Sequence, residues 1–319
     1  MRRFSVCIRR GVLVVVVLAL GTGCGPEAPL KLPPPLRVHL VIGGDADLGW
    51  IHGEAAIEHL LQETYGAVTT SKRVHTVQER RLALDAAGRH GLDIVFCIGS
   101  GFEIPVLSVT HLFPRTAFVL DHGNVVDPNV GRIEFLFGGA AYLGGVAAAV
   151  AGGSPIGIVD PGRSPEREEI EAGFEQGYRS RHPWGLFESV AGAGEIGLLP
   201  EAGVEIALYS EKSPNSGFLA VAEACGVRLV TFGSPRHGSS GDVVFASIVA
   251  DIPEAVRRVV ADVVDDTFVG KVYAFDLGSG VVDLKVHASA AEDEEVREAL
   301  DQARDAVTAG MVEVEALGL

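Results

Sequence analysis

The first residues that suggest chemistry stand at the ends of apolar runs in the sequence. The stretch LDIVFCIGSGFEIP, residues 92–105, breaks into Gly-Ser-Gly around Ser100 and then presents the aromatic side chain of Phe102. A large ring between flexible residues suits the wall of a ligand site. The alternative is that Phe102 packs beneath its own loop. Trp50, one of two tryptophans, stands beside Gly49 and is a second candidate for a ligand contact.

Two polar residues flank Trp50 in the segment DLGWIHGE. Asp47 either contacts a ligand or caps the helix that we expect over residues 53–66, because aspartate is a favoured N-cap residue. His52 either contacts a ligand or lies at the surface near the start of that helix. Both alternatives stay open for each residue.

A helix start and a glycine-rich loop in the second half of the chain add further polar candidates. Residues 213–217, SPNSG, open a helix after an apolar run, and the candidates there are Ser213, Asn215 and Ser216. The first N–H groups of a helix lack partners and carry positive potential, so they suit a polar or anionic ligand group; the alternative for Ser213 is a plain N-cap. In the loop 233–242, Arg236 and His237 either gate a cleft or are solvated.

The sequence offers no arrangement typical of catalysis. Its Gly-Ser segments do not form a Gly-x-Ser-x-Gly elbow, and no histidine pair at i, i+4 stands beside a glutamate. Cys97 and Cys225 have no partner spacing for a metal or a disulfide framework and are expected as small buried side chains. We therefore expect a protein that is not an enzyme, with no cofactor and no metal.

The amino-terminal segment predicts export. Four arginines precede the apolar run GVLVVVVLAL, and small residues lead to Cys24, which indicates a signal peptide over residues 1–23. Gly-Thr-Gly-Cys is similar to a bacterial lipobox, with Gly21 where Leu is usual, so we expect a lipid on Cys24; plain cleavage and a retained anchor are the alternatives. The apolar run is too short to span a bilayer of about 30 Å as a helix.

A proline-rich tether and a strongly acidic chain follow the signal. Residues 24–36 are rich in proline and read as a semi-rigid spacer after the anchor. Removing residues 1–23 takes away four arginines and no acid, which leaves 22 basic and 42 acidic residues and a net charge of −20. That balance argues against nucleic acid and against charge-driven docking on anionic lipid.

From residue 37 onward, apolar runs alternate with amphipathic segments. Continuous Val/Ile/Leu runs are typical of parallel strands that are covered on both faces, so the pattern predicts two doubly wound α/β lobes. Ligands bind beyond the carboxyl ends of such strands. The helix over 164–183 should begin with Ser164 as its N-cap and Pro165 at its first position. We expect strands at 37–44, 67–74, 92–99, 116–123, 155–162, 185–192, 204–210 and 227–233, and helices at 53–66, 78–91, 105–114, 164–183 and 214–226.

Several motifs in this order resemble the basic membrane protein family of bacterial lipoproteins. They are DLGWIHGE, LDIVFCIGSGF, GRIEFLFGGAAYLGGVAAAVA, PIGIVDPG and IEAGFEQGYRSRHP, and the resemblance covers residues 37–319. It implies a type I periplasmic-binding-protein fold and a substrate-binding lipoprotein of an ABC importer. Members of this family often bind purine nucleosides, so the resemblance places Asp47 and Trp50 in the first loop and Phe102 in the third, with the two rings around a flat base.

The sequence also departs from the family pattern. Ile51 stands where the family often has a polar residue, and Ser234, Pro235 and Arg236 replace the aspartate that grips ribose. A base without ribose, or a ligand with an acidic group, would suit Arg236 and His237 better. The rival functions are a ligand-sensing ectodomain and a degenerate structural lipoprotein of the same fold.

The resemblance and the alternation together give the expected organisation. One lobe should comprise residues 37–135 with 252–273, and the other residues 136–248 with 277–319. A multi-strand hinge near 134–138, 248–252 and 272–277 should close the lobes over a small-molecule ligand. We expect a monomer that docks on an ABC permease, does not bind nucleic acid, and is anchored by lipidated Cys24 on the periplasmic or outer face of a bacterial membrane.

Overall fold

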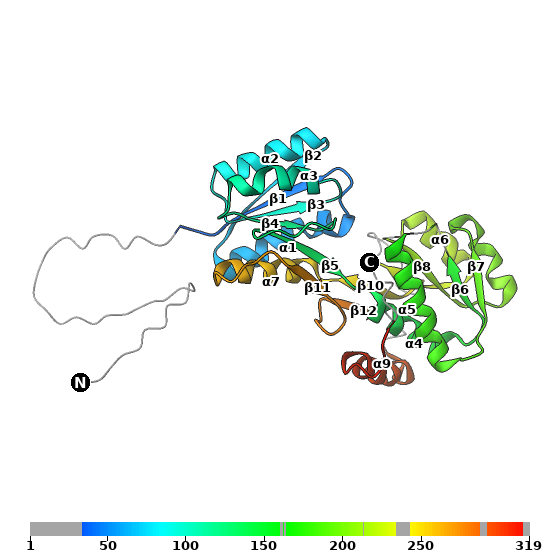
Figure 1. Ribbon diagram of the computed structural model, residues 1–319. Helices are drawn as coiled ribbons and strands as arrows, with labels where there is room; N and C mark the ends of the chain where they lie inside the picture. Colours follow the sequence, from blue (N-terminus) through cyan, green and yellow to red (C-terminus); the bar gives the residue numbers. More distant parts are fainter. Residues whose placement is uncertain are drawn as a thin grey trace, which may run out of the picture. The chain divides into compact units, whose positions relative to one another are not determined.

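The chain divides into two compact units in the computed structural model, which describes residues 34–159, 162, 164–212, 214–233, 243–287 and 292–314 (Figure 1). Unit 1 comprises residues up to Ile133 together with Ile252–Tyr273, and unit 2 comprises Glu134–Asp251 together with the chain from Ala274. The chain therefore passes between the units after residues 133, 251 and 273. The sequence places these crossings near 134–138, 248–252 and 272–277.

Unit 1 is built around a six-stranded sheet in the order β11-β5-β4-β3-β1-β2, in which β1 to β5 pair in parallel. Helices α2 and α3 cover one face of this sheet, and α1 and α7 cover the other (Figure 1). Its strands are β1 Arg37–Gly43, β2 Val68–Val74, β3 Ile94–Ile98, β4 Ala117–Leu120, β5 Val130–Phe135 and β11 Val272–Phe275. Its helices are α1 Leu48–Tyr65, α2 Val77–Arg89, α3 Glu103–Val109, the 3₁₀ turn η1 Thr110–Leu112 and α7 Ile252–Val264.

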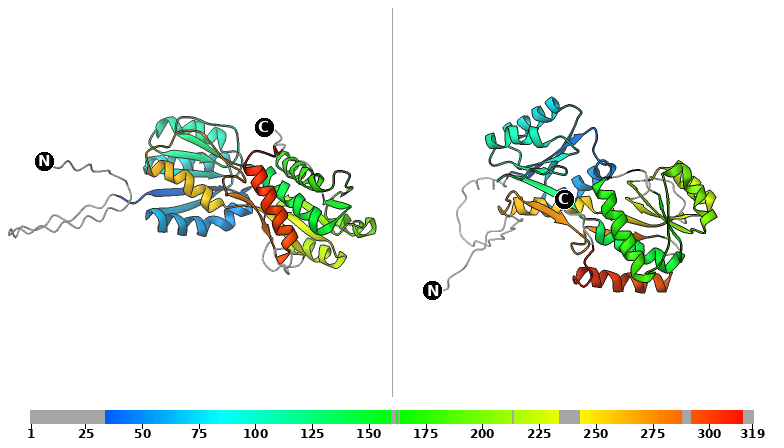
Figure 2. Two further views of the ribbon diagram at one scale, coloured as in Figure 1. Left: turned by 90° about the horizontal axis from the view of Figure 1, so that it is seen from below. Right: turned by 45° about the vertical axis from the view of Figure 1, so that its right-hand side comes forward.

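Local sequence explains most of these elements. Every residue of β3 is buried, as expected for a central parallel strand of Ile, Val and Phe. Helix α2 starts with a capping box, in which the Thr76 hydroxyl accepts a hydrogen bond from the Glu79 N–H and the Glu79 carboxylate accepts one from the Thr76 N–H. Helix α7 lies beside α1 (Figure 2), and the Tyr65 hydroxyl donates to the Arg257 carbonyl at 3.4 Å.

One helix begins earlier than the sequence predicts. Helix α1 starts at Leu48 rather than at residue 53, because the Asp47 carboxylate accepts a hydrogen bond from the Gly49 N–H at 2.6 Å and caps the first turn. At its other end, Gly66 takes a left-handed conformation with φ of 63° and ends the helix. Trp50 and His52 therefore lie in the first turns of a helix rather than in a loop.

Unit 2 has a second six-stranded sheet, in the order β12-β10-β9-β8-β6-β7, and only β12 runs antiparallel to its neighbour among the strands described. Its strands are β6 Ile156–Val159, β7 Phe187–Val190, β8 Ile206–Lys212, β9 Arg228–Phe232, β10 Val244–Ala250 and β12 Val282–Val286. Its helical segments are α4 Gly138–Gly152, α5 Pro165–Arg181, η2 Ala193–Leu198, η3 Pro200–Ala202, α6 Ser216–Cys225 and α9 Glu294–Thr308.

Helix α5 begins as predicted. Ser164 is its N-cap and accepts a hydrogen bond from the Arg167 N–H at 3.3 Å, and Pro165 is its first residue. In α6 the N-cap is Asn215, whose side-chain oxygen accepts from the Phe218 N–H at 2.9 Å. The Ser213 alternative falls on a residue outside the described ranges.

Helices α4 and α5 pack with their backbones in contact, and glycine allows this approach. A Cβ on Gly145 would lie 2.0 Å from the Phe174 carbonyl oxygen, and a Cβ on Gly177 would lie 2.0 Å from the Tyr142 carbonyl oxygen. Both distances are far below any van der Waals contact. The glycines in AAYLGG and GFEQG, which carry part of the family resemblance, therefore have a packing role in this chain.

Each unit has its own apolar core. In unit 1 the buried cluster includes Val41, Leu84, Val95, Phe102 and Phe118, and in unit 2 a separate cluster gathers around β8, β9 and α6. Among the helices that the structure describes, none is both long and apolar enough to cross a membrane.

Candidate functional site

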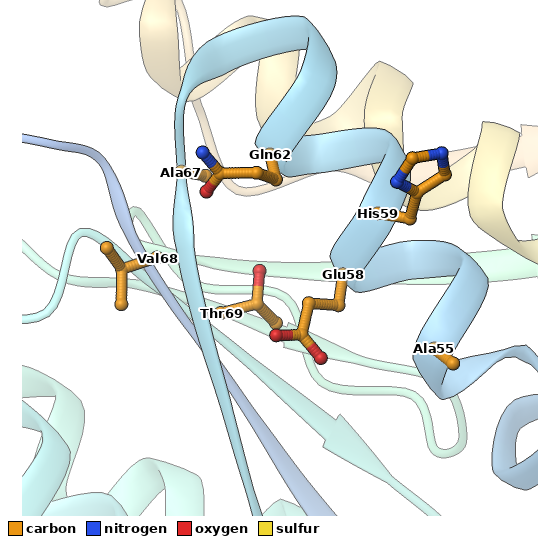
Figure 3. Close-up of a pocket in the computed structure, with 7 residues that line it drawn as sticks. All are labelled: Ala55, Glu58, His59, Gln62, Ala67, Val68 and Thr69. Atoms are coloured by element: carbon orange, nitrogen blue, oxygen red, sulfur yellow. The ribbon is translucent and has the colours of Figure 1, made fainter.

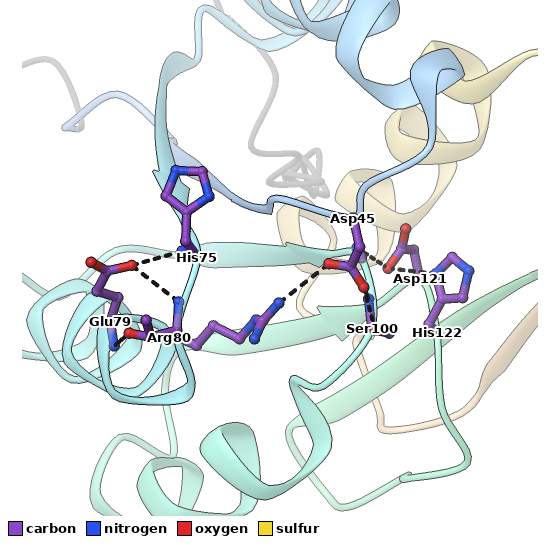
Figure 4. A network of polar contacts seen from close by, with 9 residues as sticks. Asp45, His75, Glu79, Arg80, Ser100, Asp121 and His122 are labelled. Carbon is purple, nitrogen blue, oxygen red and sulfur yellow. Dashed lines mark hydrogen bonds and ion pairs between the residues drawn. The ribbon is translucent and has the colours of Figure 1, made fainter.

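Three loops at the carboxyl ends of strands in unit 1 bring polar side chains together. Asp45 follows β1, Ser100 follows β3 and Asp121 follows β4. Their meeting point is the turn after β3: the Gly99 N–H donates to Asp121 Oδ1 at 2.8 Å, and the next N–H, that of Ser100, donates to Asp45 Oδ2 at 3.0 Å. Figure 4 shows these side chains at one end of the sheet. This is the edge where parallel α/β sheets bind ligands.

Asp45 is held on both carboxylate oxygens. Oδ2 also accepts a hydrogen bond from the Ser100 hydroxyl, and Oδ1 accepts one from Arg80 Nη2 at 3.2 Å. The Ser100 hydroxyl is the main cause that lowers the pKa of Asp45, and the Arg80 charge adds to it. Because the pKa is lowered, these bonds stabilise the fold above the ordinary carboxyl range and lose that effect as pH falls through the lowered pKa.

Arg80 reaches the cluster from α2 and is itself buried. Its guanidinium carbon lies 5.2 Å from the centre of the Phe102 ring, within the range of a cation–π contact. Its Nε–H has no hydrogen-bond partner. Arg80 thus joins the strand-end cluster to the apolar core beneath it.

Phe102 is fully buried and belongs to the core cluster of unit 1. Phe102 therefore packs beneath its own loop, which is one of the two alternatives that the sequence left open. The Arg80 cation lies over its ring. A ligand ring could stack on that side of Phe102 only if Arg80 moved. The nucleobase sandwich proposed from the resemblance is not the contact that Phe102 makes here.

Asp121 differs from Asp45 because only one of its oxygens is occupied. Its side chain is 3% exposed, and Oδ1 lies 2.8 Å from the Gly99 nitrogen and 3.1 Å from Nδ1 of His122. Oδ2 is buried and has no hydrogen-bond partner. In Figure 4 the dashed contacts converge on one oxygen of Asp121, while the other points away from them.

The loop that carries Asp121 is held from two sides. Glu103 Oε1 accepts a hydrogen bond from the Asn124 N–H at 2.7 Å. Arg132 Nη1 donates to the Gly123 carbonyl and to Asn124 Oδ1, each at 3.1 Å. These contacts fix the backbone directly after Asp121, so the orientation of its carboxylate is set before any ligand arrives.

The remaining sequence candidates lie as follows. Trp50 is 3% exposed in the first turn of α1, His52 is exposed, and Asp47 is the N-cap described above. In unit 2, Asn215 caps α6 and Ser216 is the exposed first residue of that helix. The candidates that lie outside the described residues are Cys24, Ser213, Arg236 and His237.

Unit 2 has its own polar groups on β8, within its carboxyl-terminal half. Lys212 Nζ lies 2.8 Å from Glu166 Oε1 and 5.0 Å from the centre of the Phe232 ring. The Tyr209 hydroxyl donates to Glu211 Oε2 at 2.7 Å. Burial, and then the Glu211 carboxylate, raise the pKa of Tyr209, so its hydroxyl stays a donor.

A separate hollow of ≈ 370 Å³ lies between α1 and the first residues of β2 (Figure 3). Its lining residues are Ala55, Glu58, His59, Gln62, Ala67, Val68 and Thr69. It borders the amino end of β2, whereas ligands of such sheets bind beyond the carboxyl ends. Among the described residues, no group of three His, Cys, Asp or Glu side chains could hold a metal ion.

The sequence missed Arg80, Asp45 and Asp121. Asp121 closes the apolar run TAFVL, and Asp45 follows VIGG, so the rule that points to residues just after each strand would have found both. Arg80 gave no such signal, because it lies inside an amphipathic helix with other charged residues.

Comparison with known proteins identifies the fold. The structure is similar to an ABC transporter solute-binding protein from Conexibacter woesei DSM 14684 (TM-score 0.72, 17% identity, 88% of this chain and 99% of that chain). It is also similar to one from Aeropyrum pernix K1 (TM-score 0.65, 17% identity, 88% and 93%) and to a transcriptional activator of the comK gene from Bacillus halodurans (TM-score 0.71, 18% identity, 88% and 100%). The chain has a type I periplasmic-binding-protein-like fold.

That fold is the one that the sequence predicts. No family model matches the chain, and no curated protein matches it. The resemblance to the basic membrane protein family therefore rests on the sequence motifs alone. Identities of 17–18% establish the fold and not the function, since solute-binding proteins and a transcriptional activator share it.

Proposed function

We propose that this protein is a receptor for a small polar solute and that it serves an ABC importer. The observation that carries the proposal is the cluster at the carboxyl ends of β1, β3 and β4. There the carboxylates of Asp121 and Asp45 accept hydrogen bonds from the consecutive N–H groups of Gly99 and Ser100. Polar groups held in fixed positions at this edge are what a binding protein of this fold needs. The names of two structural neighbours, which are solute-binding proteins, point the same way.

Purine nucleosides and nucleobases are the finer proposal, and they rest on the sequence resemblance. Substitution of Phe102 is not a clean test of this finer proposal. Replacing Phe102 with Ala would remove a fully buried ring and cost about 3–5 kcal/mol of stability, so lost binding could not be assigned to lost stacking. Variants of the strand-end polar residues separate binding from folding more clearly.

The alternative is a sensor that uses the same fold to report a ligand to another protein. The structural similarity to a transcriptional activator supports this alternative. A permease and an ATPase encoded beside this chain would support import, whereas a neighbouring kinase would support sensing. Capture by lobe closure, the lipid on Cys24, the exported location and the monomeric state also remain proposals.

The direct test is a thermal-shift screen of the purified protein against nucleosides, free bases, amines and small carboxylates, followed by calorimetry on each hit. A solute present at 100 times its dissociation constant should stabilise the protein by about 2.7 kcal/mol. A hit with micromolar affinity or better is expected. If no member of the panel raises the melting temperature, the receptor proposal is contradicted and a structural role is favoured.

A further inference from the structure

The strand-end cluster contains one carboxylate whose hydrogen bonding is incomplete. The side chain of Asp121 is only 3% exposed, yet its Oδ2 accepts no hydrogen bond. Buried polar atoms nearly always have a partner, and a buried acceptor without one is costly. A ligand that donates a hydrogen bond to Oδ2 would remove that deficit.

The neighbouring groups do not supply the missing donor. The Arg80 guanidinium is directed to Asp45 Oδ1 and to the face of Phe102. The Ser100 hydroxyl donates to Asp45 Oδ2, and the Gly99 N–H already donates to Asp121 Oδ1. Among the residues that the structure describes, the ion-pair partner of Asp121 is His122, at the oxygen that is already occupied. The charge of Asp45 is thus matched by Arg80, while Oδ2 of Asp121 is left for another donor.

The backbone around Asp121 cannot easily turn this oxygen toward a new partner. Asn124 is held by Glu103, and Gly123 is held by Arg132. The Oδ1 contact with Gly99 fixes the other end of the carboxylate. The deficit therefore lies in a loop that these hydrogen bonds hold in place.

We propose that the solute bound at this edge carries an amino group, and that its N–H donates to Asp121 Oδ2. This inference rests on the proposed receptor function and narrows its ligand class. A cationic or amino nitrogen supplies both the missing donor and, when charged, the compensating charge. A ligand with a carboxylate would instead be repelled by the negative charge of Asp121. This proposal therefore differs from the acidic ligand that the sequence suggests from Arg236 and His237.

The test uses two pairs of probes, and only one member of each pair carries an amino group. Adenosine is compared with purine riboside, and putrescine with succinate, by thermal shift and calorimetry on the purified protein. We expect the amino-bearing member of at least one pair to bind and its counterpart to bind at least about tenfold more weakly. Binding only by purine riboside or succinate, or equal binding within every pair that binds, overturns the inference and leaves the receptor proposal standing.

Asp121→Asn tests the residue itself. The control with the same change of charge is Asp85→Asn in α2, where the carboxylate pairs with Arg89 at 2.7 Å. The Asp121→Asn variant should lose at least about tenfold in affinity for the amino-bearing probe, while the control binds like the parent. Unchanged binding by Asp121→Asn overturns the assignment. If no probe and no other solute binds the parent protein, the receptor proposal fails and the inference fails with it.

The melting temperature of the ligand-free protein is a second readout. If Asp121 had a purely structural role, the substitution would lower this temperature. In the Asp121→Asn variant, the oxygen of the new side-chain amide can still accept from the Gly99 N–H, while the buried charge is gone. The melting temperature of Asp121→Asn without ligand should therefore equal or exceed that of the parent. A clear fall in the melting temperature overturns the claim that this carboxylate is kept for a ligand rather than for the fold.

Discussion

At the scale of single residues, Arg80 decides how the strand-end cluster is built. Its side chain is buried beneath the loops, its Nη2 binds Asp45, and its planar group covers Phe102. Arg80 therefore has two roles. It neutralises the carboxylate of Asp45, and it covers the face of Phe102 on which the sequence predicted that a ligand would stack. The contact that we propose for a solute is then the carboxylate of Asp121.

We predict that Arg80→Met lowers the free energy of unfolding by about 1–2 kcal/mol, because the cation–π contact and the hydrogen bond to Asp45 are lost while the apolar stem is kept. Urea denaturation measures the change. The control is Arg89→Met, which breaks an ion pair with Asp85 on the same helix, where the arginine side chain is 69% exposed. That variant should change stability by less than about 0.5 kcal/mol. Equal effects for both variants would contradict the role given to Arg80.

At the scale of elements, the contact between α4 and α5 depends on glycine. Gly145 and Gly177 each face the backbone of the opposite helix at distances where a Cβ does not fit. This explains why an alanine- and glycine-rich segment forms a buried helix: small side chains let the two helices approach along their backbones, and the gain in packing offsets the low helix propensity of glycine.

We predict that Gly145→Ala destabilises the protein by about 2 kcal/mol or more, because the added methyl group would have to push the helices apart. Gly53→Ala is the control within another helix, α1, where a Cβ would meet nothing within 4 Å. It should raise stability by about 0.5–1 kcal/mol through helix propensity alone. The two variants are compared by urea denaturation. A stabilising Gly145→Ala would show that the helix contact is wrong.

At the scale of the whole molecule, each unit is discontinuous in sequence but has its own core. Unit 1 is completed by α7 and β11, which come more than a hundred residues after its other strands, and α7 packs on α1. Unit 1 is therefore complete only once the chain has passed through most of unit 2, although the apolar clusters that stabilise the units are separate.

We predict that Leu84→Ala, which empties a fully buried position in the core of unit 1, acts mainly on that unit. Removing a buried leucine side chain costs about 2–5 kcal/mol. Amide hydrogen exchange should accelerate in β1, β3 and β4 and change little in β6 and β8, since cooperative units open separately. The same acceleration in both sheets would mean that the chain opens as one cooperative unit.

The sequence by itself determined the order and type of the strands and α-helices between residues 37 and 123 and between residues 155 and 233. Continuous apolar runs indicated parallel strands, and local caps such as Ser164 with Pro165 set helix starts, because both signals act over a few neighbouring residues. The same local reasoning found Ser100 by its place after a strand. It left the start of α1 five residues late, since Asp47 was equally compatible with a ligand contact.

The tertiary structure alone decided what the candidate site is made of. Whether Phe102 turns into the core or toward a ligand depends on Arg80, which comes from a different helix. The unpartnered oxygen of Asp121 depends on which N–H groups two other loops bring beside it. Residue type and spacing cannot supply these facts, because hydrogen bonds and burial between distant segments are fixed only when the sheet brings its strand ends together.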